Sequence, residues 1–177
     1  MVVFSYKNEL TLKNKFNKST NIIHDKEDCK DYIIMQSTKD TLKTFFKIDY
    51  HNSIALIGSF GCGKSSLLLY INTLLAQNKN SESCLKQLKK IDKQLFKMYK
   101  IFTKNREFIR IKIVGEHISF KSQFKNAINK HSIFETTQKY LKENELFQMS
   151  KALECLDKDL EKSNYSDVLF SIDEFGK

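Results

Sequence analysis

The stretch ALIGSFGCGKSS, residues 55–66, holds three of the chain's five glycines. The apolar run SIALIG (53–58) leads into it, and the Leu-rich run KSSLLLYINTLLA (64–76) leaves it without a helix breaker. A short apolar run that ends in glycine is typical of a strand buried on both faces of a parallel sheet, whereas the longer run predicts a buried helix. The local order is therefore a strand, a glycine-rich loop and a helix.

Residues 58–65 satisfy the spacing G-x-x-x-x-G-K-[ST], which is typical of loops that cradle phosphate groups. Glycines let the backbone approach a ligand closely, so the amides of residues 61–66 are expected to point inward at a β-phosphate. The N-terminus of the following helix adds positive charge. We expect Lys64 to reach the β- and γ-phosphate oxygens and the Ser65 hydroxyl to hold Mg²⁺. The predicted phosphate-binding residues are Gly58, Ser59, Phe60, Gly61, Cys62, Gly63, Lys64, Ser65 and Ser66.

A second set of candidate residues ends the apolar run VLFSID (168–173). Nucleotide-bound Mg²⁺ keeps several waters, and a carboxylate at the C-terminal tip of a neighbouring parallel strand can hold one of them. Asp173 is predicted to take this role, which makes Ser65 and Asp173 the predicted metal-site residues. Glu174 is predicted to act as the general base on the attacking water, so Lys64 and Glu174 are the predicted catalytic residues. Acidic residues also simply end strands, and the glycine-rich loop is what favours the catalytic interpretation.

The remaining sequence alternates between strand and helix patterns. Residues 108–113 alternate Ile with Phe, Arg and Lys, which indicates a strand at a sheet edge, and residues 1–6 have the composition of a short strand. Helices are expected at 37–48, at 84–102 as one amphipathic helix, and at 119–162 as two or three segments. Strands separated by helices predict an α/β fold with a parallel sheet.

Residues 58–65 and 168–174 resemble the Walker A and Walker B motifs of P-loop NTPases. The Asp-Glu pair is similar to that of the branch with a catalytic glutamate, which includes AAA-like, ABC-type, RecA-like and KAP-type ATPases. The phrasing IALIGSFGCGKSSLL (54–68) is most similar to the AAA-like and KAP-type members. The resemblance implies a P-loop ATPase that binds ATP with Mg²⁺. It also implies a lead-in at 1–36 and an ATPase core at 37–177 with a helical insertion at about 82–104.

Several features of these families are missing. An ABC-type ATPase should carry an LSGGQ-like signature before the Asp-Glu pair, and ECLDKDLEKSNYSD (154–167) does not match it. No NKxD guanine reader follows the second motif, and Arg106 and Arg110 are the only arginines for a kinase lid. The family's sensor strand and arginine finger would lie beyond Lys177. We therefore expect a truncated ATPase, incomplete at its C-terminal side and weak or inactive in hydrolysis alone; the alternative is that another chain supplies these parts.

The composition is that of a globular chain with an excess of lysine. The formal net charge is +9, with 41% hydrophobic and 29% charged residues. The lysines fit a solvated surface, although a nucleic-acid face stays open as the alternative. No apolar run approaches the roughly 20 residues that span a bilayer, and the first ten residues do not form a signal peptide. Four scattered cysteines predict free thiols in a reducing compartment, so we expect a cytoplasmic protein.

Two functions follow from these residues. The first is an ATPase in which hydrolysis of the β–γ phosphate bond drives work on a macromolecule, with nucleic acid or a partner protein as the target and oligomerisation left open. The alternative is a regulatory module that binds ATP without hydrolysing it and thereby orders a surface for a protein partner. A small-molecule kinase is the third and weakest hypothesis.

Overall fold

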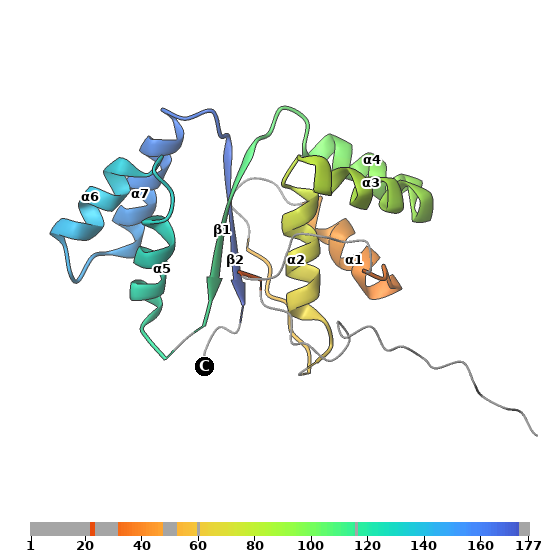
Figure 1. Cartoon of the computed structure of the whole chain (residues 1–177), viewed down its shortest axis with the longest axis horizontal. Helices are drawn as coiled ribbons and strands as arrows, with labels where there is room; N and C mark the ends of the chain where they lie inside the picture. Colours follow the sequence, from red (N-terminus) through yellow and green to blue (C-terminus); the bar gives the residue numbers. More distant parts are fainter. Residues whose placement is uncertain (1–21, 24–31, 48–52, 60, 116, 174–177) are drawn as a thin grey trace, which may run out of the picture.

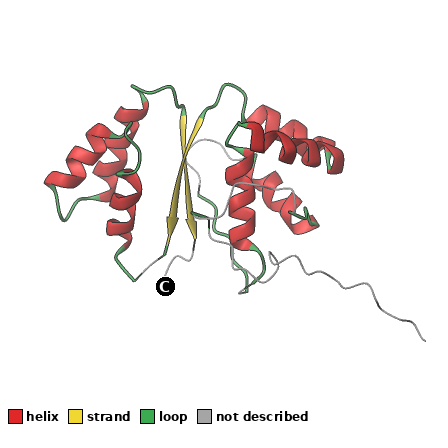
Figure 2. Cartoon of the chain, in the orientation of Figure 1, coloured by secondary structure: helices red, strands yellow, loops and turns green. Residues whose placement is uncertain are grey.

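The computed structural model describes residues 22–23, 32–47, 53–59, 61–115 and 117–173. Its centre is a sheet of two parallel strands with helices on both faces (Figures 1 and 2). The predicted α/β fold with a parallel sheet is thus confirmed for the described residues. The strand expected at residues 1–6 lies outside them.

The strands β1 (Phe108–Val114) and β2 (Asp167–Asp173) pair in parallel over their full lengths. Alternation along β1 sends its three isoleucines into one helical layer, where they are buried. The opposite face of β1 carries Phe108 and Arg110, which point toward the other layer. The alternation of residue types along β1 therefore belongs to a strand whose two faces are covered by different helical layers.

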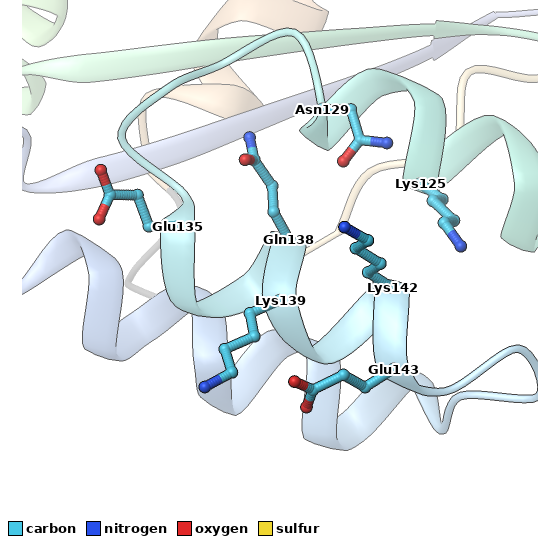
Figure 3. Close-up of a pocket in the computed structure, with 7 residues that line it drawn as sticks. All are labelled: Lys125, Asn129, Glu135, Gln138, Lys139, Lys142 and Glu143. Atoms are coloured by element: carbon cyan, nitrogen blue, oxygen red, sulfur yellow. The ribbon is translucent and has the colours of Figure 1, made fainter.

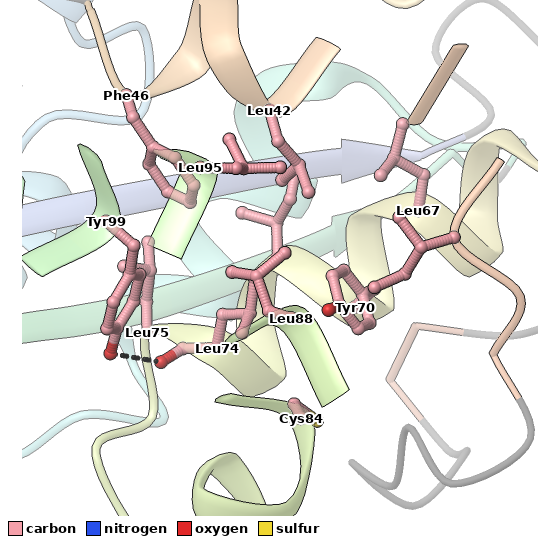
Figure 4. Close-up of a cluster of buried hydrophobic side chains, with 12 residues drawn as sticks. Leu42, Phe46, Leu67, Tyr70, Leu74, Leu75, Cys84, Leu88, Leu95 and Tyr99 are labelled. Carbon is pink, nitrogen blue, oxygen red and sulfur yellow. Dashed lines mark hydrogen bonds between the residues drawn. The ribbon is translucent and has the colours of Figure 1, made fainter. Parts of the chain in front are cut away.

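One layer contains α1 (Gln36–Phe45), α2 (Lys64–Leu74), α3 (Lys79–Ile91) and α4 (Lys93–Phe102). Its core is the cluster drawn in Figure 4, which gathers buried leucines from all four helices. The buried Tyr99 hydroxyl donates a 3.0 Å hydrogen bond to the Leu74 carbonyl, which joins α4 to the end of α2. The residues of this cluster are Ile34, Leu42, Phe46, Leu67, Tyr70, Ile71, Leu74, Leu75, Cys84, Leu88, Leu95 and Tyr99.

The other layer contains α5 (Phe120–Ile128), α6 (Glu135–Glu143) and α7 (Met149–Leu160). Apolar residues were expected at every third or fourth position of this region. Two of them, Phe124 and Ile128 of α5, are buried against β1 and β2. Phe124 stacks on Phe170 of β2 with ring centroids 5.7 Å apart. Three helices over residues 119–162 confirm the prediction of two or three segments.

The amphipathic segment 84–102 forms two helices rather than the single helix predicted. Asp92 interrupts it in an extended conformation (φ −150°, ψ 100°), and its carboxylate accepts a 2.9 Å hydrogen bond from the Leu95 amide. Asp92 is thus the N-cap of α4, because a short acidic side chain satisfies the first free amides of a helix. The hydrophobic spacing continues across the break and conceals it in the sequence.

The predicted buried strand at residues 53–58 is absent. Residues 53–59 have no strand assignment, and the side chain of Ile57 is 95% exposed. Leu56 alone among these residues packs against the α1–α4 cluster. A strand needs a neighbour for its backbone hydrogen bonds, and among the described residues no strand pairs with this segment.

The expectation of free thiols is wrong for Cys84, which is disulfide-bonded, whereas Cys62 and Cys155 are free.

The starts of the two strands are joined by Arg106, whose guanidinium donates two hydrogen bonds to the Asp167 carboxylate. The Phe102 and Phe108 rings stack on each other with centroids 5.7 Å apart, and the Arg106 guanidinium lies beside this pair, 4.5 and 4.8 Å from the two centroids.

Candidate functional site

Glycine is required at three positions of the Walker A loop (residues 58–65) for two different reasons. Gly61 and Gly63 have φ angles of +77° and +86°, a left-handed conformation that side chains disfavour. A Cβ atom at either position would meet nothing within 4 Å, so conformation rather than space selects glycine there. At Gly58 the reason is space, because a Cβ atom would lie 2.7 Å from the Cys62 sulfur.

The Lys64 side chain folds back over this loop. Its ammonium group donates hydrogen bonds of 2.8 Å to the carbonyls of both Gly58 and Ser59 and lies 3.6 Å from the Cys62 sulfur. An ammonium group has three donors, so these three contacts use all of them. Lys64 therefore holds a positive charge inside the curve of the loop instead of extending into solvent.

The loop leads into the N-terminus of α2, which lacks a side-chain cap. Its N-cap residue is Gly63, which has no side chain to accept a hydrogen bond from the amides of the first turn. Amides in the first turn of a helix have no intrahelical acceptor, so those of Lys64 and Ser65 face the loop. Together with the helix dipole, this makes the start of α2 suitable for a phosphate.

The carboxyl ends of the strands lie at the same edge of the molecule as this helix start. In Figure 1 both strand arrows end at the edge where α2 begins. Asp173 is the last residue of β2 and is 7% exposed, and its carbonyl accepts a 2.8 Å hydrogen bond from Gly115. A buried carboxylate and a half-buried Ser65 hydroxyl are oxygen donors of the kind that Mg²⁺ prefers.

Two predicted site residues lie outside the described residues: Phe60 of the loop and the general-base candidate Glu174. The other predicted residues of the loop belong to the loop itself or to the first turn of α2. Among the described residues, no group of three His, Cys, Asp or Glu side chains is placed to hold a metal ion.

Sequence analysis missed three polar residues that join α2 to the sheet. Asn72 is fully buried on α2 and donates a 2.7 Å hydrogen bond to the Ser171 hydroxyl of β2. Arg110 of β1 donates a 2.9 Å hydrogen bond to the Asn72 carbonyl. A polar residue within an otherwise apolar helix run was the available signal, because buried amides need partners.

The segment 154–167, where an ABC-type ATPase would carry its signature, forms the second half of α7, the turn before β2 and the first residue of β2. Its Asp159 is 3% exposed and accepts hydrogen bonds from the Thr136 amide and from the amide and hydroxyl of Thr137. Burial alone raises the pKa of Asp159, but these hydrogen bonds outweigh it and lower the pKa. The segment therefore carries a structural carboxylate that caps α6.

A surface hollow of about 700 Å³ lies between α5 and α6 in the other helical layer (Figure 3). Its lining mixes three lysines with Glu135 and Glu143. Gln138 is held there by hydrogen bonds to the carbonyls of Ile128 and His131. Acidic and basic groups in one open hollow select no charged ligand, and the hollow is separate from the Walker A loop.

The loop, the helix start and the parallel sheet define a P-loop NTPase. Comparison with protein families adds a match to the ABC transporter model over residues 43–168, more than half of the chain. The chain belongs to this family, whose members are ATP-binding P-loop ATPases. No curated protein and no solved structure shows significant similarity to the chain. Within the described residues, none of the helices is long and apolar enough to cross a membrane.

Proposed function

We propose that this chain binds ATP together with Mg²⁺ at the Walker A loop and belongs to an ATPase that hydrolyses the β–γ phosphate bond. The observation that carries the proposal is the position of Lys64. Its ammonium group is held inside the loop by the carbonyls of Gly58 and Ser59, beside the uncapped start of α2. Positive charge and free amides then converge on one small volume, as phosphate binding requires.

The Lys64 contacts suggest how a nucleotide would enter. Of its three acceptors, the Cys62 sulfur is the most distant at 3.6 Å, and a thiol sulfur is a weak acceptor. A γ-phosphate oxygen would replace this contact first, because a charged oxygen makes a much stronger hydrogen bond with an ammonium group. The two carbonyl contacts could then keep the lysine in place.

Ser65 and Asp173 are the residues we assign to Mg²⁺, with Ser65 as a direct ligand and Asp173 holding one of the metal's waters. When bound, Mg²⁺ would neutralise charge on the β- and γ-phosphates. Glu174 would accept a proton from the attacking water. If Glu174 serves hydrolysis, Glu174→Gln should abolish turnover and keep ATP binding; unchanged turnover and binding would favour the regulatory module that binds ATP without hydrolysis.

The branch within the superfamily bears on the partner. The family match favours the ABC-type branch, and the AAA-like or KAP-type assignment stays a prediction from the motif phrasing. The segment 154–167 lacks the ABC signature and caps α6 instead. We propose that hydrolysis is coupled to work on a macromolecule, either nucleic acid or a protein, with self-assembly as a further option. A cytoplasmic location remains a proposal, and the disulfide at Cys84 removes one argument for it.

The test is ATP binding by wild type, Lys64→Ala and a matched control. Lys79→Ala is the control, because Lys79 is also the first residue of a helix but is exposed and outside the loop. Wild type and Lys79→Ala should bind ATP with equal affinity, whereas Lys64→Ala should lose about 1.5–3 kcal/mol, roughly tenfold or more. Equal affinities for all three proteins would overturn the proposal.

A further inference from the structure

Asn72 is a polar side chain in the middle of the helix that begins the Walker A site. It is 0% exposed, and its Nδ2 atom donates to the Leu68 carbonyl at 2.8 Å and to the Ser171 hydroxyl at 2.7 Å. Its Oδ1 atom is buried and has no hydrogen-bond partner among the described residues. An apolar side chain would fill this position without leaving an acceptor unpaired, so packing alone does not account for asparagine here.

The helical repeat places Asn72 and Ser65 on one stripe of α2. Seven residues separate them, which is about two turns at roughly 3.6 residues per turn. Asn72 faces β2, so Ser65 projects from the same side of the helix. On β2, Ser171 and Asp173 are two residues apart and therefore lie on the same face of the strand. The bonded pair Asn72–Ser171 thus sits directly behind the proposed metal pair Ser65–Asp173.

The spacing along the two elements brings the second pair to within about 3 Å of the same height. Ser65 lies about 10 Å from Asn72 along α2, and Asp173 lies about 7 Å from Ser171 along β2. The helix starts at the edge where the strand ends (Figure 1), so both steps run toward that edge. The Asn72–Ser171 hydrogen bond therefore fixes how far α2 can slide or rotate against β2, and with it the separation of Ser65 and Asp173.

Arg110 adds a second connection at the same point. Its Nη1 atom donates to the Asn72 carbonyl at 2.9 Å, and Arg110 pairs in register with Leu169 of β2. Asn72 is therefore held through its side chain by β2 and through its backbone by β1. The helix is attached to both strands at one residue.

From this geometry we infer that Asn72, through Ser171, is a positioning residue that sets the Mg²⁺-dependent part of ATP binding. The inference rests on the proposed ATP–Mg²⁺ site. Asn72 touches neither nucleotide nor metal; it acts by holding Ser65 in line with Asp173. Loss of the bond should leave the loop and its lysine intact while it misplaces the two groups that serve the metal.

The experiment measures ATP affinity in EDTA and in excess Mg²⁺, and the readout is the ratio of the two Kd values. The variants are Asn72→Leu and Ser171→Ala, and Ser171→Thr keeps the hydroxyl as the conservative rescue. Thr73→Val is the matched control, because Thr73 is equally buried on α2 but its hydroxyl donates to the Leu69 carbonyl of its own helix and, among the described residues, to no strand. Thermal unfolding checks that each variant is folded.

Wild type, Thr73→Val and Ser171→Thr should share one Mg²⁺ ratio, and Asn72→Leu and Ser171→Ala should lose about tenfold of it. Their affinity in EDTA should change by less than about twofold, since the anion-binding loop is untouched. The inference is overturned if folded Ser171→Ala keeps the full ratio, if both affinities fall together, or if wild type gains nothing from Mg²⁺. Absence of any ATP binding by wild type would instead overturn the proposed function.

Discussion

Gly58 and Cys62 face each other across the Walker A loop so closely that a single methyl group at Gly58 would lie 2.7 Å from the Cys62 sulfur. Real carbon–sulfur contacts are far longer, so one of the two residues must stay small for the loop to close. The pair therefore links two positions that the G-x-x-x-x-G-K-[ST] spacing treats as independent.

Gly58→Ala should weaken ATP binding by about 1–2 kcal/mol, roughly tenfold, because overpacking displaces the Cys62 side chain and the Lys64 contacts near it. The double variant Gly58→Ala/Cys62→Ala removes the sulfur and should recover most of this loss. Titration of ATP into the four proteins of this cycle measures the effect. Additive losses in the double variant would show that the contact does not control the loop.

Alkylation of Cys62 should abolish ATP binding, and Mg-ATP should protect the thiol. Cys62 is exposed and lies 3.6 Å from the Lys64 ammonium group, so an adduct would occupy the phosphate position. Peptide mass spectrometry after iodoacetamide treatment gives the labelling rate at each cysteine. Cys155, the other free thiol among the described residues, lies on α7 and serves as the internal control, with no expected protection. Equal Cys62 labelling with and without Mg-ATP would contradict the prediction.

Asp159→Asn should destabilise the fold at neutral pH by about 1–3 kcal/mol, because the carboxylate accepts three hydrogen bonds at the start of α6. The folded-state pKa of Asp159 is lowered, so its contribution is complete above the unfolded pKa of about 3.9 and is lost as pH falls through the folded pKa. Urea unfolding should show a large difference from wild type at neutral pH that shrinks in acid. The exposed Asp157→Asn on the same helix should behave like wild type, and a pH-independent difference at Asp159 would refute the capping role.

Arg106→Lys should cost about 1–2 kcal/mol of stability, because lysine cannot donate the paired hydrogen bonds to Asp167 or offer a planar cation to the Phe102 and Phe108 rings. Burial raises the pKa of Asp167, and the hydrogen bonds from Arg106 and Ser166 more than reverse this and lower it. Chemical denaturation measures the change, with exposed Lys104→Gln as the control. Unchanged stability of Arg106→Lys would mean that backbone pairing alone holds the starts of the two strands together.

Sequence patterns predicted those helices and strands that are specified by their own residues. The α2 helix and β2 follow from apolar runs next to a glycine-rich loop and an acidic pair, and they form as expected. The strand predicted at 53–58 does not form in the structure, because a strand depends on a neighbouring strand that its own sequence does not specify. Asp92 was overlooked because hydrophobic spacing continues through it, although an Asp three residues before Leu95 is a readable capping signal.

The polar contacts behind the site could not be predicted in the same way. Asn72 and Ser171 are 99 positions apart in sequence, and only the packing of α2 on β2 brings them together. Arg106 and Arg110 were considered as lid arginines, whereas the structure uses both inside the fold. The charge of the two arginines suggested a role in binding phosphate, whereas their positions beside the sheet give them a structural role.

The sheet of two strands has a consequence for how the chain behaves in solution. Within the described residues each strand has one side without a neighbouring strand, and such edges can pair with edges of other molecules. A net charge of +9 opposes this contact between like-charged copies, and salt shortens the range of that repulsion from about 10 Å at 0.1 M to about 3 Å at 1 M. Added salt should thus favour self-association, whereas it would weaken any binding of the lysine-rich surface to nucleic acid.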